Sequence, residues 1–358
     1  MAPFRQDLRF AHSADGTRIA YAIHGGGYPL VRAAHWLTNI DFDWQTPVWR
    51  PWFDALGARF QFHRYDSRGC GLSDHESTDV SLDLLIADLE AVVDAAGLDR
   101  FALLGMSQGG AISIAYAARH PDRVSHLVLL GAFARGPLRR DPSAKQLASI
   151  RAQIKLIEVG WGQDNPAFLQ LFTSQIFPNA TPDQVRSFNE LQRMSCTPDH
   201  AARIVAAYYD IDATPYLADV ASPTLVLHSR GDMRSPFATE GLHIASTIPG
   251  ARLVPLETSS HVALAGEPAF DRVIEEIEAF LPAARDGSAG AFANLTRRER
   301  EILDLLARGR DNSQIAAHLA LSEKTVRNNV TRIFDKIGAE NRGQAIVQAR
   351  EAGLGRSA

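Results

Sequence analysis

The stretch Phe101-Ala-Leu-Leu-Gly-Met-Ser-Gln-Gly-Gly110 decides the fold of this 358-residue chain. Its apolar first half is typical of a buried strand, and a helical pattern of small residues follows from Ala111 to Arg119. Between the two lies a G-x-S-x-G pattern, Gly105-Met106-Ser107-Gln108-Gly109, which indicates a serine at the tip of a sharp turn. Glycines fit such a turn because larger side chains would clash with the adjoining strand and helix. A chance glycine-rich turn is the structural alternative.

Outward from this stretch, strand patterns alternate with helix patterns. A hairpin of residues 8–12 and 17–23 is expected around Asp15-Gly16, which is a preferred turn pair. Ser81 can cap a helix at 82–96 that Gly97 ends. Further strands are expected at 29–34, 60–65, 124–130, 224–228 and 251–256, and further helices at 48–58, 237–246 and 268–281. The alternation predicts the α/β class, with a mostly parallel sheet covered by helices on both faces.

Residues 135–219 interrupt this alternation with a helical, irregular, proline-punctuated pattern. An insertion of this length between two strands is expected to form a cap over the carboxyl edge of the sheet. Its aromatic side chains are expected either in the core of the cap or on the wall of a ligand pocket, and the sequence leaves both fates open. They are Trp161, Phe168, Phe172, Phe177, Phe188, Tyr208 and Tyr209.

Two further polar residues follow strand patterns. Asp232 comes after the strand at 224–228, and His261 comes after the strand at 251–256. Loops that follow the carboxyl ends of parallel strands converge on one crevice, so both side chains should lie near Ser107. A serine hydroxyl becomes nucleophilic when a histidine takes its proton, and a carboxylate orients that histidine. Each residue alone has a structural alternative, but together they predict a catalytic triad of Ser107, Asp232 and His261.

Residues 8–283 resemble an α/β-hydrolase with a cap domain. The resemblance rests on the triad in the chain order Ser, Asp, His, and on the loop from Asp66 to Asp74, which is expected to brace the site. It implies an oxyanion hole formed by the backbone N–H of Gln108 and of a residue after His35, expected to be Trp36. Many members carry His-Gly where this chain has His35-Trp36, so an indole is expected at the pocket mouth.

The run His24-Gly25-Gly26-Gly27 is similar to the oxyanion motif of lipases. That motif follows the third strand, whereas this run precedes the strand at 29–34. It is therefore predicted to be the turn into that strand.

The composition, with 46% hydrophobic and 22% charged residues, favours a soluble globular protein. Cys70 and Cys196 provide no disulfide framework and no metal-ligand spacing, so neither a metal nor a cofactor is expected. The first thirty residues lack a signal-peptide pattern, and no window approaches the roughly 18 apolar residues of a membrane span. A cytoplasmic protein without a membrane partner is expected.

Charge is distributed unevenly along the chain. Residues 291–358 hold 12 Lys and Arg against 8 Asp and Glu, whereas the whole chain has a net charge of −4. A basic module on an acidic body indicates nucleic-acid binding, although this excess alone is a weak signal. The sequence predicts a hydrolase-like sensor or catalytic domain at 1–283, a linker at 284–293 and a helical domain at 294–358.

Helices in this last domain are expected from Thr296 to Gly309, at 312–319, from Ser322 to Gly338 and at 342–351, the first with a capping box of Thr296 and Glu299. The third helix is amphipathic: its apolar stripe consists of Val326, Val330, Ile333 and Ile337. Its polar face carries Lys324, Thr325, Arg327, Asn328, Thr331 and Arg332. Such a face on the second of two tightly connected helices predicts contacts to double-stranded DNA. A solvated helix surface is the alternative.

Four stretches together resemble the LuxR-type helix-turn-helix family over residues 293–352. They are Leu295 to Leu303, Asn312 with Ile315-Ala316, Leu321 to Arg327, and Lys336-Ile337-Gly338. The resemblance implies bacterial transcription control and dimeric DNA binding, with a dimerisation helix at 342–351. Asn329 stands where the family often has histidine.

The fusion predicts a transcription regulator whose hydrolase-like domain binds a small acyl ester or lactone-like ligand and controls DNA binding by a homodimer. An active serine esterase or lactonase with secondary DNA binding is the alternative. A catalytically dead fold that serves as a dimerisation platform is the third hypothesis. The ligand, the operator and the choice between activation and repression stay open.

Overall fold

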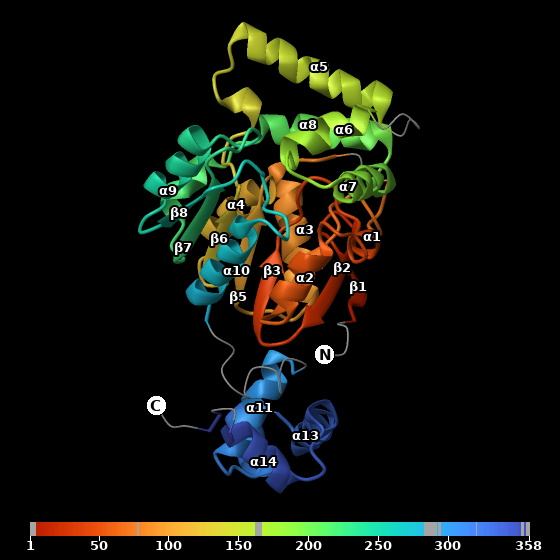
Figure 1. Ribbon diagram of the computed structural model, residues 1–358. Coiled ribbons are helices and arrows are strands. Elements are labelled where there is room, and N and C mark those ends of the chain that lie inside the picture. Colours follow the sequence, from red (N-terminus) through yellow and green to blue (C-terminus); the bar gives the residue numbers. More distant parts are fainter. Residues whose placement is uncertain are drawn as a thin grey trace. The chain divides into compact units, whose positions relative to one another are not determined.

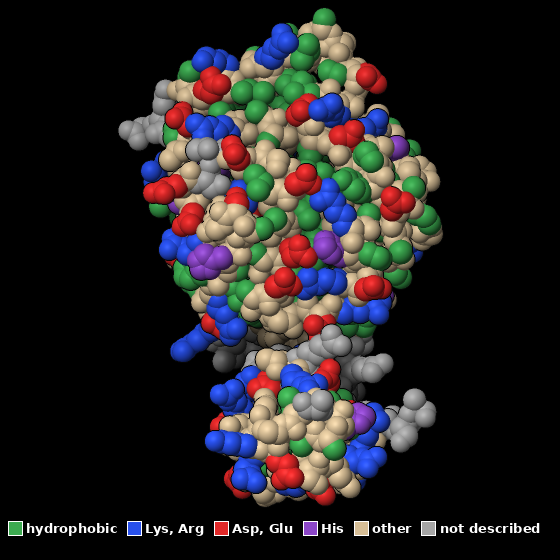
Figure 2. All heavy atoms as spheres, turned by 180° about the vertical axis from the view of Figure 1, so that it is seen from behind, with side chains coloured by type: hydrophobic (Ala, Val, Ile, Leu, Met, Phe, Trp, Pro, Cys, Tyr) green, Lys and Arg blue, Asp and Glu red, His purple; other side chains and the backbone are tan. Residues whose placement is uncertain are grey.

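The computed structural model describes residues 5–76, 79–161, 167–282, 292, 295–319, 321–351 and 354–355. It divides into two compact units, Met1–Leu281 and Pro282–Ala358, each with a hydrophobic core of its own. The linker predicted at 284–293 lies outside the described residues, except for Phe292. Within the described ranges, no helix is both long and apolar enough to cross a membrane. On the face shown in Figure 2, acidic and basic side chains of the first unit are interspersed.

The described part of the first unit contains one eight-stranded sheet (Figure 1). Its strands are β1 (Asp7–His12), β2 (Arg18–Gly25), β3 (Tyr28–Arg32), β4 (Phe60–Tyr65), β5 (Phe101–Met106), β6 (Val124–Leu130), β7 (Thr224–Ser229) and β8 (Arg252–Leu256). They lie in the order β1-β2-β4-β3-β5-β6-β7-β8. Only the β1–β2 and β2–β4 pairs of this sheet are antiparallel. The predicted mostly parallel sheet and its N-terminal hairpin are therefore confirmed.

Helices cover both faces of the sheet (Figure 1). On one face, α3 (Leu82–Ala95) packs against α4 (Gly109–Arg119). On the other face lie α2 (Arg50–Gly57) and α10 (Pro268–Phe280), which touch where the ring of Trp52 meets that of Phe270 edge to face at 4.9 Å. The remaining short helices of this unit's body are α1 (Ile40–Asp43), the π-helix η3 (Phe237–Gly241) and α9 (Leu242–Thr247).

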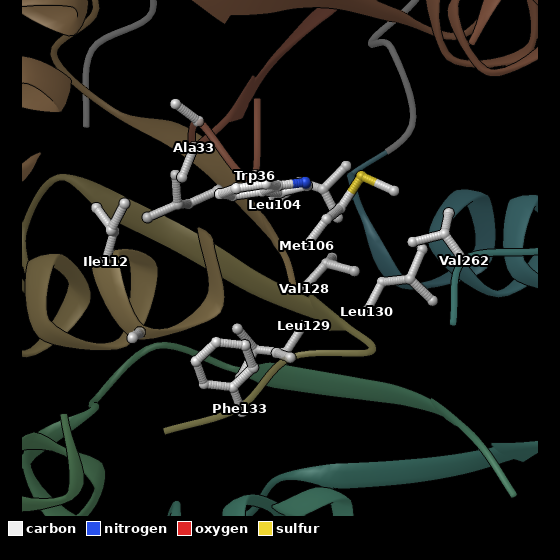
Figure 3. Packing of buried hydrophobic residues seen from close by; sticks show 14 of the residues in the cluster. Ala33, Trp36, Leu104, Met106, Ile112, Val128, Leu129, Leu130, Phe133 and Val262 are labelled. Carbon is white, nitrogen blue, oxygen red and sulfur yellow. The ribbon is translucent and has the colours of Figure 1, made fainter. Parts of the chain in front are cut away.

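The core of the first unit is centred on β5 and β6. In Figure 3, Leu104 and Met106 of β5 lie close to Val128 and Leu130 of β6, and Ile112 of α4 packs nearby. These side chains are almost fully buried, and burying one of this size contributes about 1.5–3 kcal/mol. The carboxyl ends of β5 and β6, where the site begins, are thus held by apolar packing.

The segment between β6 and β7 is helical, and it is called the cap below. Its elements are η1 (Pro137–Arg139), α5 (Ala144–Gly160), α6 (Ala167–Ile176), α7 (Pro182–Ser195), α8 (Pro198–Asp210) and η2 (Thr214–Asp219). Backbone hydrogen bonds join it to the body: Gly71 N–H donates to Ser195 O and His261 N–H donates to Ile176 O, both over 2.8 Å. Most of the cap aromatics are buried, and Phe177, Phe188 and Tyr209 also line cavities.

The loop from Asp66 to Asp74 braces the body of the first unit, whereas its bracing of the active site stays a prediction. The Asp66 carboxylate accepts the N–H groups of Ile40 (2.9 Å) and Leu72 (2.8 Å), and burial raises the pKa of this carboxyl to about 7. Arg68 forms a buried ion pair with Asp88 of α3 at 2.6 Å. The sequence prediction did not name Asp88, because this residue lies within an otherwise apolar helical stripe.

The second unit consists of α11 (Arg297–Ala307), α12 (Asn312–Leu319), α13 (Glu323–Ile337) and α14 (Arg342–Glu351). The predicted capping box is present: Thr296 N–H donates to the Glu299 carboxylate over 2.8 Å, and Glu299 N–H donates to the Thr296 hydroxyl over 3.3 Å. The Ser322 hydroxyl caps α13, and Gly338 ends it with a left-handed φ of 66°. Lys336 of α13 pairs with Glu299 at 2.7 Å, which ties α13 to α11.

Candidate functional site

Ser107 occupies the turn between β5 and α4. Its φ of 51° lies in the left-handed region, a strained conformation that costs a non-glycine residue about 1–3 kcal/mol. The turn needs its glycines, since a Cβ at Gly105 would lie 2.9 Å from the Gly109 carbonyl oxygen, and one at Gly110 would lie 2.4 Å from the Ala132 Cβ. The local sequence therefore forces the serine to the tip of the turn, at the carboxyl edge of the sheet.

His261 and Asp232 meet beside this turn. The Nδ1 atom of His261 lies 2.6 Å from Oδ2 of Asp232, whose Oδ1 accepts the N–H groups of Arg234 and Ser235. Burial alone would raise the pKa of Asp232, but His261 and the hydrogen bonds hold it below its usual value. A carboxylate beside Nδ1 fixes the proton on that nitrogen and leaves Nε2 with a lone pair.

The Nε2 atom of His261 is buried and has no hydrogen-bond partner in the part of the chain that the structure describes. His261 and Ser107 both line a small cavity of about 20 Å³. This volume holds about one water molecule. The same cavity is lined by His35, Trp36 and Gln108, so it brings together the residues that the sequence predicts for the site, with Asp232 behind His261.

The indole of Trp36 lies under the cap. Its side chain is buried, and its ring meets that of Trp161 edge to face at 5.7 Å. His35 is also buried, and burial lowers the pKa of its imidazole well below the usual value, so the ring is neutral near pH 7. Its Nδ1 lies 3.1 Å from the carbonyl oxygen of Trp36. Trp36 and His35 thus form an uncharged wall beside Ser107.

The backbone N–H of Trp36, an expected oxyanion donor, donates to Oε1 of Gln108 over 3.0 Å. The side chain of Gln108 therefore occupies the place that an oxyanion would take at this donor. Two other backbone N–H groups near Ser107, those of Gln108 and Leu37, have no hydrogen-bond acceptor among the described residues. Leu37, the second residue after His35, has a positive φ of 44°.

A larger cavity of about 430 Å³ adjoins the small one. Ser107, Gln108 and Arg234 line both. The walls come from the segment after β6, from α5 and from the loop after β7. Its volume lies within the range of small-molecule sites, so the serine stands where a ligand-sized space meets the histidine.

The polar face of α13 is exposed as predicted. Lys324, Thr325, Arg327, Asn328, Thr331 and Arg332 are all exposed. Val326, Val330 and Ile333 on the other face are buried in the core of the second unit. The ion pairs of the described part of this unit use other residues, so the three cationic side chains are available to an external anion.

Two family models match the chain. The model of the α/β hydrolase fold matches residues 37–268. The chain belongs to the α/β-hydrolase family. The model of the bacterial regulatory proteins of the luxR family matches residues 293–349, so this α/β-hydrolase carries a LuxR-type helix-turn-helix domain at its C-terminal end. Both resemblances noted in the sequence are confirmed.

Relatives of this α/β-hydrolase have hydrolase names. It is 30% identical over 272 residues to the putative carbamate hydrolase RutD of Azorhizobium caulinodans, covering 73% of this chain and 94% of the relative. It is 30% identical over 244 residues to the AB hydrolase superfamily protein YisY of Bacillus subtilis, covering 67% and 87%. The solved structure of the esterase EaEST from Exiguobacterium antarcticum is similar with a TM-score of 0.63 and 25% identity, covering 76% and 98%.

Sequence reasoning missed three arginines of the α/β-hydrolase domain that line the larger cavity: Arg135, Arg140 and Arg234. A signal was present, because the basic run Arg139-Arg140 follows soon after β6 and Arg234 stands two residues after Asp232.

Within the described residues, no group of three or more His, Cys, Asp or Glu side chains is placed to hold a metal ion.

Proposed function

We propose that this chain is a bacterial transcription regulator whose α/β-hydrolase domain binds a small acyl ester or lactone-like ligand and thereby controls DNA binding by its LuxR-type domain. One observation carries the proposal: the same chain joins a cavity at Ser107 to a helix-turn-helix unit with an exposed basic face. A ligand that binds one arrangement of the chain better than another shifts the population toward it.

On the DNA side, the proposed contacts are those of α13. Lys324, Arg327 and Arg332 meet phosphates or base edges, and the polar side chains of Thr325, Asn328 and Thr331 lie on the same face. A homodimer presents two such helices to two half-sites, so the separation of the half-sites follows from the geometry of the dimer.

The second candidate is an active serine esterase or lactonase with secondary DNA binding. The 2.6 Å contact between His261 and Asp232, together with the unpartnered Nε2, supports it. In this mechanism, Ser107 Oγ attacks the acyl carbon while His261 Nε2 takes its proton and passes it to the leaving alcohol. A water molecule, deprotonated by the same nitrogen, then cleaves the acyl-serine ester and releases the acid.

The oxyanion of each tetrahedral intermediate requires two N–H donors. Gln108 N–H supplies one, and Leu37 or Trp36 supplies the other, Trp36 only after the Gln108 side chain has moved. The names of the relatives, a putative carbamate hydrolase and an esterase, support a carbonyl compound as the ligand.

The regulator is tested by DNA binding of the full chain to the region upstream of its own gene. Arg327→Ala is expected to weaken specific binding by about 10- to 100-fold, because a good base or phosphate contact is worth about 1–3 kcal/mol. Arg139→Ala, which removes an exposed arginine paired with Asp210 in the first unit, serves as the control and should bind like the parent chain. Absence of specific binding, with Arg327→Ala indistinguishable from the parent chain, would refute the proposal.

A turnover assay distinguishes the ligand-binding regulator from the active esterase or lactonase. Small acyl esters and lactones are offered to the parent chain and to Ser107→Ala, and release of acid is followed. Turnover that disappears in Ser107→Ala supports the esterase or lactonase. A lack of Ser107-dependent turnover on every acyl substrate excludes it and leaves ligand binding as the role of the cavity.

A further inference from the structure

The cavity of about 430 Å³ beside Ser107 has an unusual wall for an esterase-like site, because three arginine side chains line it. Arg135 and Arg140 come from the segment after β6, and Arg234 comes from the loop after β7. Amide and hydroxyl groups add further polar lining, whereas no Asp or Glu appears among the described lining residues. Phe133, Ile150 and Met233 also line the cavity, so an acyl chain can pack there beside the cationic cluster.

The positive charge of this wall is only partly compensated. Glu240, which is fully buried, lies 3.1 Å from Arg135 and 3.3 Å from Arg140, so one carboxylate serves two guanidinium groups. Arg234 donates to the neutral partners Gln175 (3.1 Å) and Tyr209 (3.3 Å). Asp232 is committed to His261 and to backbone N–H groups. The cavity therefore carries an excess of cations.

Two guanidinium atoms in this cluster are buried and have no hydrogen-bond partner among the residues that the structure describes: Nη2 of Arg140 and Nε of Arg135. A buried donor that lacks an acceptor costs about 1–3 kcal/mol, and more when it is charged. Burial lowers the pKa of Arg140, Glu240 opposes this effect, and the like charges of Arg135 and Arg234 add to it. An anion in the cavity would reduce the repulsion among the three guanidinium groups.

We propose that this cavity binds a carboxylate, held by Arg140 and Arg234, so that the ligand is an acyl ester or lactone with a carboxylate on its acyl part. This proposal rests on the proposed binding of an acyl compound at Ser107. The planar guanidinium fork matches a carboxylate with two parallel hydrogen bonds, which favours this anion over a neutral group. The ester carbonyl then lies at Ser107 and the carboxylate lies in the larger cavity.

The two arginines belong to different parts of the domain. Arg140 stands in the cap segment, whereas Arg234 follows β7 and bonds to Gln175 of α6 and Tyr209 of α8 in the cap. Arg234 also donates its backbone N–H to Asp232 over 2.8 Å. A carboxylate between Arg140 and Arg234 thus joins the cap to the loop that positions His261.

The test compares two ligands that differ only in the terminal group, monomethyl glutarate and methyl pentanoate, by calorimetry at constant ionic strength. Ser107→Ala in the full chain prevents turnover. In this background, monomethyl glutarate is expected to bind at least tenfold more tightly than methyl pentanoate. Arg140→Gln and Arg234→Gln are each expected to reduce this ratio of affinities by about tenfold, toward equal binding of the two esters.

The matched control is Arg139→Gln, because Arg139 precedes Arg140, is half exposed and pairs with Asp210. It should keep the ratio of the Ser107→Ala parent. Equal binding of the two esters overturns the carboxylate site while leaving the binding of an acyl ligand intact. The carboxylate site is also overturned if neither Arg140→Gln nor Arg234→Gln changes the ratio of the two affinities. If neither ester binds, both the carboxylate site and the proposed ligand binding fall.

Discussion

At the scale of single residues, Gln108 has two opposed roles in the proposed site. Its backbone N–H is an unpaired donor next to Ser107, whereas its side-chain oxygen accepts the N–H of Trp36 over 3.0 Å. The resting chain thus satisfies one potential oxyanion donor internally. Any ligand oxygen that uses Trp36 N–H must first displace the Gln108 amide.

Replacing Gln108 with Met is expected to speed the reaction of Ser107 with a fluorophosphonate by about 2- to 10-fold. The substitution keeps the backbone donor and removes a hydrogen bond worth about 0.5–1.5 kcal/mol that the reaction must break. The measurement is the rate constant of covalent labelling, with Ser107→Ala as the unlabelled control. An unchanged or slower rate would show that Trp36 N–H takes no part.

The proximity of Ser107, Asp232 and His261 could be predicted from the sequence, because each follows a strand pattern and parallel strands bring their carboxyl ends to one edge. The direction of the Gln108 side chain could not be predicted, since it depends on a rotamer and on a backbone group 72 residues away. Arg140 and Arg234 carry a weak local signal, but that they line one cavity depends on the tertiary packing of distant segments.

At the scale of helices and strands, local signals predicted the second unit well. Thr296 with Glu299 marks the start of α11, Ser322 marks the start of α13, and Gly338 ends it. These signals act through backbone groups within a few residues, so tertiary structure is not needed to find them. The short helix α1, capped by Asn39, was missed because four residues carry too little periodicity.

Thr296→Ala should destabilise the first turn of α11 by about 1 kcal/mol, because the N-terminal N–H groups lose a hydroxyl acceptor. Amide hydrogen exchange in this turn of the full chain should then become about fivefold faster. Ser313→Ala, at the start of α12, is the control and should leave exchange in α11 unchanged. Equal exchange in the Thr296 variant and the parent chain would contradict a stabilising capping box.

At the scale of the whole molecule, the fusion could be predicted from sequence because the α/β-hydrolase pattern and the LuxR-type pattern occupy separate segments of the chain. Each family pattern is complete within its own segment, 37–268 and 293–349, so neither depends on the other for recognition. The cavity is different, because its walls combine the cap with loops about a hundred residues apart. No local pattern encodes its volume.

The proposed DNA interface on the basic face of α13 predicts that DNA affinity depends on salt. If Lys324, Arg327 and Arg332 each neutralise a phosphate, the logarithm of the binding constant should fall with the logarithm of salt concentration with a slope of about −3 per protomer. Arg332→Gln should reduce this slope by about 1. The slope is measured by titration from low to physiological salt, and a flat response would contradict the proposed interface.

The hydrogen bond from the backbone N–H of His261 to the backbone carbonyl oxygen of Ile176 has a further consequence. Its donor belongs to the body and its acceptor ends a cap helix, so this amide exchanges with solvent only when the two separate. The exchange rate of one proton therefore measures the free energy of lifting the cap. A ligand that binds only beneath the closed cap slows this exchange by a factor of 1 + L/Kd, where L is the free ligand concentration. The exchange rate of this amide therefore reports how much of the protein is bound to ligand.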